Sequence, residues 1–217
     1  AYMASHDLKE PLRKIRTFNS LVSSNDEDQQ VISKYTNKIE QSADRMSRLI
    51  DSILDYSRIE EQLSKDDQIN LDEILNDVIA DLTLLIEDRN VNIIESDLGE
   101  VHGVPIRIYQ LFSNLIRNAI KFNTNDPIIE IRSEIIDASK LSQIILNPKS
   151  LSYKKISFTD NGIGIEPDKR DYIFKPFKRL NPKDKYPGTG IGLAICKKIM
   201  DVHNGFIDIE SNEKGGS

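Results

Sequence analysis

Apolar residues recur at helical spacing through about the first sixty positions of the chain. They fall every three or four positions over residues 4–22, which predicts one helix. A polar cluster at residues 23–28 interrupts this pattern, and a second run of nearly heptad spacing covers residues 31–54. Asp26 with Gln29 three positions later resembles a capping box and predicts where the second helix begins. Together the two runs predict an antiparallel helical hairpin.

A hairpin alone buries only the face between its two helices, so part of its apolar stripe stays exposed. Pairing two hairpins into a four-helix bundle covers that stripe, and we therefore expect a homodimer formed through residues 1–66. The alternative is that the hairpin packs against a second domain of its own chain. The heptad pattern ends near Lys65, which is where we place the boundary between the two domains. The second domain is expected to cover residues 67–217.

Beyond the hairpin the pattern changes to short apolar runs and shorter helices. Pro105 stands at the start of an amphipathic helix, where proline is well tolerated. Asp72 is expected to cap an earlier helix whose apolar residues continue through Ile86, and a last helix follows Gly192. The predicted strands cover residues 68–71, 91–94, 128–136, 155–159 and 206–210. These elements predict an open mixed sheet covered by helices on one face, with residues 137–153 left unassigned.

The composition is that of a soluble protein with an acidic balance. The 217 residues are 38% hydrophobic and 29% charged, and the formal net charge of −6 argues against a dedicated nucleic-acid-binding protein. No apolar run approaches the roughly 20 residues needed to span a bilayer, and no signal peptide is visible. The single cysteine, Cys196, excludes a disulfide or a zinc site within one chain. We expect a cytoplasmic fragment, which is compatible with a membrane anchor upstream of Ala1.

Two glycine clusters, at residues 160–165 and 188–193, flank a loop rich in lysine. Glycine allows the main chain to approach a ligand closely. The second cluster leads into the last predicted helix, whose free N–H groups and dipole favour an anion. The spacing matches neither a P-loop nor a dinucleotide-binding fingerprint. The clusters predict a phosphate-bearing ligand held mainly by backbone, with a tight turn and a flexible linker as the alternative.

A polar row lies along the predicted helix that begins at Pro105. Asn114, Asn118 and Lys121 are four and three positions apart, so they share one edge of the helix. Asparagine is a mediocre helix former, and two of them in register call for a reason. Amide oxygens can hold Mg²⁺, and a nearby lysine can meet phosphate oxygens. The alternative is a solvated helix edge.

The first predicted helix carries His6 next to Asp7. At ~100° per residue, His6 lies roughly 160° from Leu8 around the helix and so faces away from the apolar seam. The Asp7 carboxylate is placed to orient an imidazole and to raise its basicity. Pro11, one turn later, weakens the helix by removing a backbone hydrogen bond. These features indicate a functional histidine, although an exposed histidine is also ordinary on a helix surface.

Five segments, in this order, resemble the catalytic core of a sensor histidine kinase, and within that family the phytochrome-type and hybrid members. They are residues 5–12 (the phosphoacceptor box), 114–122 (the N box), 160–165 (the first glycine box), 173–177 (the F box) and 188–193 (the second glycine box). The resemblance covers nearly the whole chain. It implies an α+β fold: an N-terminal antiparallel helical hairpin, dimeric as a four-helix bundle, followed by an α/β sandwich ATP-binding domain of the histidine kinase, gyrase and chaperone ATPase type.

The resemblance also implies a role for individual residues. His6 would be the phosphoacceptor and Asp7 its orienting base. ATP and Mg²⁺ would be the cofactors, with Asn118 as the metal ligand and with Asn114 and Lys121 near the triphosphate. The remaining nucleotide contacts would come from Phe122 against the purine, Asp160 at the adenine amino group, Gly162, Gly164 and Ile165 beside the base, and Leu193. A mobile lid over the phosphates would consist of Arg179, Gly188, Thr189, Gly190, Ile191 and Gly192, anchored by Phe174 and Phe177.

The family passes its phosphoryl group to an aspartate of a response-regulator receiver domain, and a sensor domain would precede Ala1. Glu10 stands where many members have Thr or Asn, which puts phosphatase activity in doubt. Residues 137–153 form a longer connection than usual, and the final strand expected after Gly216 is absent. The stimulus, the cognate regulator, and phosphorylation within one subunit or across the dimer are not readable from the sequence.

Two other functions compete with a histidine kinase. An ATPase of the chaperone, gyrase and mismatch-repair kind needs a glutamate general base one turn before Asn114, where this chain has Gln110. A degenerate kinase would serve only for dimerisation and docking, but Asn118, Asp160 and both glycine clusters are intact.

Overall fold

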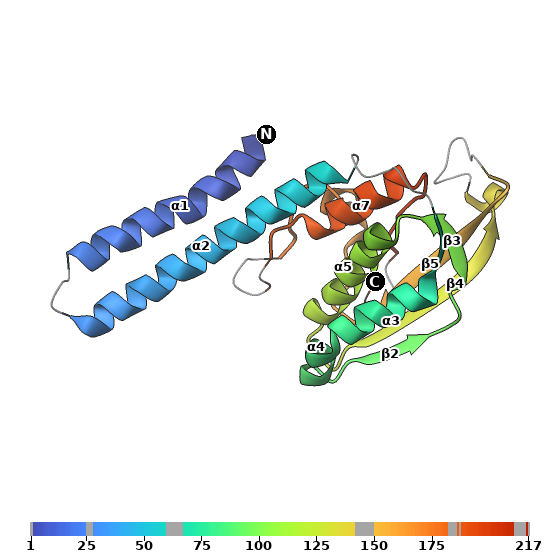
Figure 1. Cartoon of the computed structure of the whole chain (residues 1–217), viewed down its shortest axis with the longest axis horizontal. Coiled ribbons are helices and arrows are strands. Elements are labelled where there is room, and N and C mark those ends of the chain that lie inside the picture. Colours follow the sequence, from blue (N-terminus) through green and yellow to red (C-terminus); the bar gives the residue numbers. More distant parts are fainter. Residues whose placement is uncertain are drawn as a thin grey trace.

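The computed structural model shows a long helical hairpin that projects from a compact α/β lobe (Figure 1). It describes residues 2–24, 28–59, 67–141, 150–181, 186, 188–210 and 216, with the backbone alone for residues 2–6, 140 and 141. No helix in these ranges is long and apolar enough to cross a membrane.

The hairpin consists of α1 (Tyr2–Ser23) and α2 (Gln29–Arg58), which confirms the two predicted helices. The predicted cap is wrong: α2 begins directly after Asp28, whose carboxylate accepts hydrogen bonds from the backbone of Gln30 and Val31. Gln29 is therefore the first residue of α2 rather than its third, and Asp26 lies outside the described residues. Helix α1 continues through Pro11, which is buried.

The two helices cover each other only in part. Within α2 only Ser42 and Leu49 are buried. Leu12, Ile50 and Leu54 remain 47%, 44% and 45% exposed. The hairpin therefore keeps an apolar stripe on its surface, as the sequence predicts for a helical pair that packs against a second hairpin.

The end of α2 packs into the α/β lobe. Ile59, directly after α2, is 1% exposed and belongs to the core of that lobe. Arg107 donates a hydrogen bond of 3.3 Å to the carbonyl oxygen of Arg58, the last residue of α2. The Nζ of Lys198 lies 4.4 Å from the ring centroid of Tyr56. The boundary proposed near residue 66 stays a prediction, because residues 60–66 lie outside the described ranges.

The lobe contains two small sheets. The three-stranded sheet has the order β2 (Asn92–Glu95), β4 (Ile128–Asp137) and β5 (Ser152–Asp160). Strands β2 and β4 are parallel and β4 and β5 antiparallel, which confirms the predicted mixed sheet. Strands β1 (Asp67–Asn70) and β3 (Glu100–Gly103) form an antiparallel pair.

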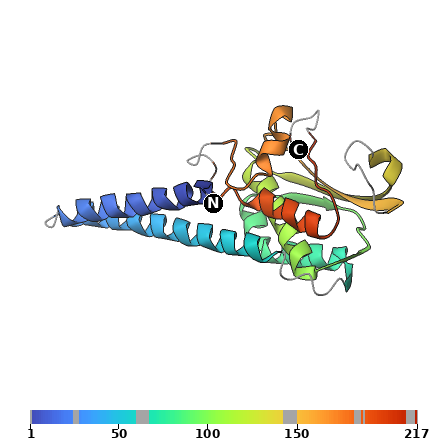
Figure 2. The ribbon, with the colours of Figure 1, turned by 90° about the horizontal axis from the view of Figure 1, so that it is seen from above.

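Helices α3 (Leu71–Asp81), α5 (Pro105–Lys121) and α7 (Gly192–Val202) gather beside the sheet and build the core with it (Figures 1 and 2). The shorter helices are α4 (Thr83–Asp88), α6 (Arg170–Ile173), and the 3₁₀ turns η1 (Ala138–Leu141) and η2 (Pro167–Lys169). Side chains from both layers, such as Val78, Ile116, Ile131 and Ile199, are 0% exposed.

Three predicted details of the lobe are wrong. Asn70, not Asp72, caps α3, because the Asp72 carboxylate is engaged instead by the backbone N–H groups of Leu98 and Gly99. The helix expected to continue through Ile86 breaks at Leu82 into α3 and α4. Residues 206–210 form no strand, since no described segment completes a ladder beside them.

Candidate nucleotide and phosphoacceptor site

Helix α5 presents the predicted polar row on its edge. Its apolar side chains are buried in the core, and Pro105 is its first residue, as predicted. Burying that face leaves Asn114, Asn118 and Lys121 half-buried along one side of the helix. The Nδ2 of Asn114 donates to the carbonyl oxygen of Gln110 at 2.9 Å, which fixes the amide orientation.

The first glycine cluster lies directly against the end of α5. Asp160 is the last residue of β5, and its Oδ1 accepts a hydrogen bond of 2.7 Å from the Gly162 N–H. The N–H of Ile163 donates to the carbonyl oxygen of Phe122 at 3.0 Å. A Cβ on Gly162 would lie 2.7 Å from that same carbonyl oxygen, so only glycine allows this approach. The turn thus brings Asp160 beside the polar row. Gly164 and Ile165, farther along the turn, are half-buried.

The second glycine cluster closes over the same edge. Arg179 donates from Nη1 to the carbonyl oxygen of Gly188 at 2.8 Å and from Nη2 to that of Tyr186. A Cβ on Gly188 would lie 2.8 Å from the Nζ of Lys121. Gly190 has a φ of +76°, a left-handed conformation that favours glycine. Arg179 therefore holds this cluster against the lysine of α5.

Helix α7 begins at the polar row. Its first residue is Gly192, and no side chain caps its N-terminus. A Cβ on Gly192 would lie 3.2 Å from the Oδ1 of Asn114, so the start of α7 lies against the amide of Asn114. Ile191 is buried, whereas Thr189 and Leu193 are half-buried. The structure thus brings both glycine clusters, Asp160 and the polar row of α5 together.

Two cations crowd this edge. Burial, followed by the charge of Arg179, lowers the pKa of Lys121 below its ordinary value. Burial, followed by the charge of Arg45, lowers the pKa of Arg179, while Asp7 acts in the opposite direction. A bound anion would offset both the burial and the mutual repulsion, so the electrostatics suit a phosphate-bearing ligand.

Several contacts at this site could not be found from the sequence. The ring of Tyr186 lies 5.0 Å from that of Phe122, and Tyr186 is buried. The Oδ1 of Asn161 accepts the Ile128 N–H at 2.8 Å and holds the turn after β5 to the start of β4. Gly216 lies against the Asp160 backbone so closely that a Cβ would overlap it. Each of these contacts joins segments far apart in the chain, so local spacing gave no signal of it.

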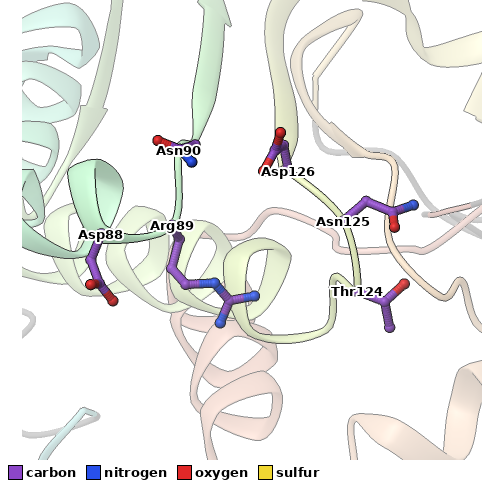
Figure 3. A pocket seen from close by; sticks show the side chains of 6 residues that line it. All are labelled: Asp88, Arg89, Asn90, Thr124, Asn125 and Asp126. Atoms are coloured by element: carbon purple, nitrogen blue, oxygen red, sulfur yellow. The ribbon is translucent and has the colours of Figure 1, made fainter.

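Two hollows of about 450 Å³ each lie near the end of α5. One borders the site and is lined by Leu85, Arg89, Arg117, Ile120, Lys121, Asn123, Thr124 and Tyr186. The other is polar and open, and Figure 3 shows its lining residues: Asp88, Arg89, Asn90, Thr124, Asn125 and Asp126. The glycine clusters do not line this second hollow, so we do not assign it to the nucleotide.

His6 lies within α1, but its side chain is outside the described part, so its predicted orientation stays a prediction. Asp7 is half-buried and close enough to Arg179 to influence its pKa. Glu10 pairs with Lys14 at 3.3 Å and with Arg45 at 3.7 Å. The histidine-bearing end of the hairpin is therefore within electrostatic range of the second glycine cluster.

Two family models match the chain. Residues 1–62 match the His Kinase A (phospho-acceptor) domain. Residues 103–217 match the histidine kinase-, DNA gyrase B-, and HSP90-like ATPase. The chain belongs to the sensor histidine kinase family. This confirms the predicted resemblance, and it makes the α/β lobe the ATP-binding domain of a sensor histidine kinase.

A sequence relative agrees with this assignment. Cyanobacterial phytochrome A from Nostoc sp. is 36% identical over 214 residues, which cover 97% of this chain and 26% of the phytochrome. This sensor histidine kinase chain thus spans about a quarter of that relative's length.

Two solved structures show the same fold across the hairpin and the lobe. Histidine kinase ThkA in complex with the response regulator protein TrrA has a TM-score of 0.70 at 23% identity, over 99% of this chain and 58% of that one. Full-length ShkA in complex with AMPPNP has a TM-score of 0.62 at 20% identity, over 99% and 43%.

Proposed function

We propose that this chain is an ATP-dependent protein-histidine kinase that autophosphorylates His6 and passes the phosphoryl group to an aspartate of a response-regulator receiver domain. One observation carries the proposal. A cation-lined edge of α5, closed by two glycine clusters, stands on the same chain as a phosphoacceptor-type hairpin whose Asp7 acts on Arg179.

The polar row would bind the triphosphate. The amide oxygen of Asn118 fits Mg²⁺, a hard cation that prefers oxygen ligands and keeps phosphates and waters in its shell. Asn114, Lys121 and the N-terminus of α7 would hold phosphate oxygens. Because one amide oxygen fills only one position of that shell, this metal would depend on the nucleotide for its other ligands. Bound there, Mg²⁺ would neutralise charge on the triphosphate.

The first glycine cluster would bind the base. The Asp160 carboxylate would accept a hydrogen bond from the adenine amino group, and Phe122 would lie against the purine. Gly162, Gly164 and Ile165 would let the backbone pass close to the ring. ShkA, which shares this fold, was solved with the ATP analogue AMPPNP, and this supports a nucleotide as the ligand.

Phosphoryl transfer depends mainly on position and electrostatics. A neutral imidazole nitrogen of His6 would attack the γ-phosphorus, the bond to the β–γ bridging oxygen would break, and ADP would leave with that electron pair. Asp7 would orient the ring and stabilise the positive charge that develops on it. The lid would close over the phosphates, anchored by Phe177, which packs on the core. Its residues, with the adjoining start of α7, are Arg179, Gly188, Thr189, Gly190, Ile191, Gly192 and Leu193.

The hairpin would bind both protein partners. Its exposed stripe suits a second copy of the chain in a four-helix bundle. ThkA, which shares the fold, was solved with the response regulator TrrA, and this supports a receiver-domain partner. Glu10 is engaged in two ion pairs, and we infer that kinase activity dominates over phosphatase activity.

A simple ATPase is the competing function. It would need a general base one turn before Asn114, but Gln110 there accepts a hydrogen bond of 3.0 Å from Arg107. An amide lacks the basicity to activate water.

The test uses ATP labelled at the γ-phosphate, with Mg²⁺. We expect native protein to retain label that is labile in acid and stable in alkali, as a phosphohistidine is. His6→Ala and Asn118→Ala should both lose it. Label retained by His6→Ala would contradict the assigned phosphoacceptor. Free phosphate without labelled protein would favour the ATPase.

A further inference from the structure

One side chain ties the end of α7 to the start of α5. His203 ends α7, and its ring is half-buried. Its Nε2 accepts a hydrogen bond of 3.0 Å from the backbone N–H of Val104, which precedes the first residue of α5. Its Nδ1 lies 2.7 Å from the carbonyl oxygen of Ile199 within α7. Each ring nitrogen therefore binds a different helix.

These two partners define the protonation state of His203. A carbonyl oxygen only accepts, so Nδ1 must carry the proton that it donates to Ile199. A backbone N–H only donates, so Nε2 must offer Val104 a lone pair. Only a neutral ring in the Nδ1–H tautomer satisfies both partners at once. In the other neutral tautomer, or in the imidazolium ion, the bond to Val104 is lost.

The backbone of β3 leaves room for this ring. Gly103, the last residue of β3, is buried, and a Cβ there would lie 3.2 Å from the Cδ2 of His203 and 3.3 Å from its Nε2. Because both distances are shorter than ordinary van der Waals contact, any larger residue would have to displace the imidazole.

Helices α5 and α7 therefore meet at two fixed points. Near the start of α7, Gly192 lies against the amide of Asn114. At its end, His203 holds Val104, ten positions before that asparagine. The two helices run antiparallel, and these contacts set how far one is displaced along the other.

We propose that His203 is a positioning residue for nucleotide binding: as a neutral Nδ1–H imidazole it fixes the register between α5 and α7. The inference rests on the proposed function, in which Asn114, Asn118 and the first turn of α7 hold the triphosphate. His203 touches none of the reacting atoms. It would act by fixing the distances between the groups that hold the triphosphate, because small displacements of such groups weaken binding and slow the reaction.

The tautomer is tested on the native chain without any mutation. Long-range ¹H–¹⁵N correlation spectra of the imidazole rings distinguish Nδ1–H from Nε2–H, and the chain has three histidines to assign. We expect His203 to give the Nδ1–H pattern at neutral pH, both with and without AMPPNP and Mg²⁺. An Nε2–H pattern or a doubly protonated ring would overturn the inference.

Three substitutions test the role. In His203→Gln the Oε1 can accept from Val104, whereas His203→Asn can donate only to Ile199 and His203→Phe can do neither. By calorimetry, AMPPNP with Mg²⁺ should bind to the Gln variant within about twofold of native affinity, and about fivefold to tenfold more weakly to the Asn and Phe variants. His102→Phe, at an exposed position of β3, is the matched control and should bind as native.

The thermal midpoint without nucleotide is measured for all four variants. Equal affinity in the folded Gln and Asn variants would leave His203 a structural role only and overturn the proposal. If native protein fails to bind AMPPNP, the proposed function fails instead, and the two failures are thereby distinguished. Should the variants not fold, the native ring still tests the proposal, because an Nε2–H or doubly protonated ring would overturn it.

Discussion

The hairpin and the ATP-binding domain differ in where their apolar side chains lie. In the domain, residues such as Val78, Ile116 and Ile131 are 0% exposed and meet across helices and strands. In the hairpin, Ile50 and Leu54 are almost half exposed. Burial is the main source of folding free energy. The domain therefore buries its apolar side chains within one chain, whereas the hairpin keeps an exposed stripe that we expect a second copy to cover.

The two regions also differ in how they build function. The hairpin offers a histidine on a regular helix, followed within one turn by the ion pairs of Glu10. The domain assembles its site from the end of β5, the edge of α5, the start of α7 and the segment that carries Arg179. Under the proposed function, the hairpin would carry the reactive group and the domain would hold its co-substrate, an arrangement that suits a phosphotransfer enzyme with moving domains.

The largest effect is expected in the core of the domain. Ile116→Ala removes a side chain that is 0% exposed, and it should lower the free energy of unfolding by about 2–5 kcal/mol. Ile106→Ala, on the same helix but 61% exposed, is the matched control and should cost less than about 0.5 kcal/mol. Urea unfolding measures both. Similar losses from the two variants would mean that α5 does not bury the face described.

The next effect concerns the stripe on the hairpin. Leu54→Asp places a charge where a second hairpin is expected to pack, and it should raise the dimer dissociation constant at least about a hundredfold. Leu84→Asp, at an 82% exposed leucine of α4, should leave it unchanged. Analytical ultracentrifugation over a concentration series measures the dissociation constants of both variants. A Leu54→Asp dimer as tight as native would place the interface elsewhere.

A smaller effect is expected in how the stability of the ATP-binding domain depends on pH. Burial raises the pKa of Asp72, but hydrogen bonds donated by the Leu98 and Gly99 N–H groups help to lower it overall below its ordinary value. A lowered folded pKa stabilises the protein above the unfolded pKa, and this stability is lost as the pH falls through the folded value. Asp72→Asn should therefore cost about 1–3 kcal/mol at pH 7 and progressively less below pH ~4.

The control for this prediction is Glu73→Gln, an exposed change one position along α3. It should leave the dependence of unfolding on pH as in native protein. A constant difference between Asp72→Asn and native protein from pH 7 to pH 2 would show that the lost shape, not the lost charge, matters.

The sequence predicted what depends on local periodicity. Helices α1, α2, α5 and α7 lie where the apolar spacing placed them, and Pro105 begins α5. Both glycine clusters also lie against α5, Gly162 beside Phe122 and Gly188 beside Lys121. These helices are encoded within a few turns of chain, so distant residues do not alter them.

The remainder depends on contacts between distant segments. Asp72 resembles a helix cap in sequence, but the N–H groups of Leu98 and Gly99, 26 and 27 positions later, take its carboxylate. Strand β3 forms because it pairs with β1, and its own sequence has no pattern that predicts a strand. The contact between Tyr186 and Phe122 and the bonds of His203 to Val104 likewise join segments far apart in the chain.

The central claim is that the domain delivers a phosphoryl group to one residue of the hairpin. The most direct measurement is mass-spectrometric mapping of the phosphorylated residue after incubation with ATP and Mg²⁺, under conditions that preserve phosphoramidate bonds. We predict phosphate on His6 alone, and none when Asn118→Ala is treated in the same way. Phosphate on any other residue, or an unmodified His6 in protein that binds and consumes ATP, would contradict the account.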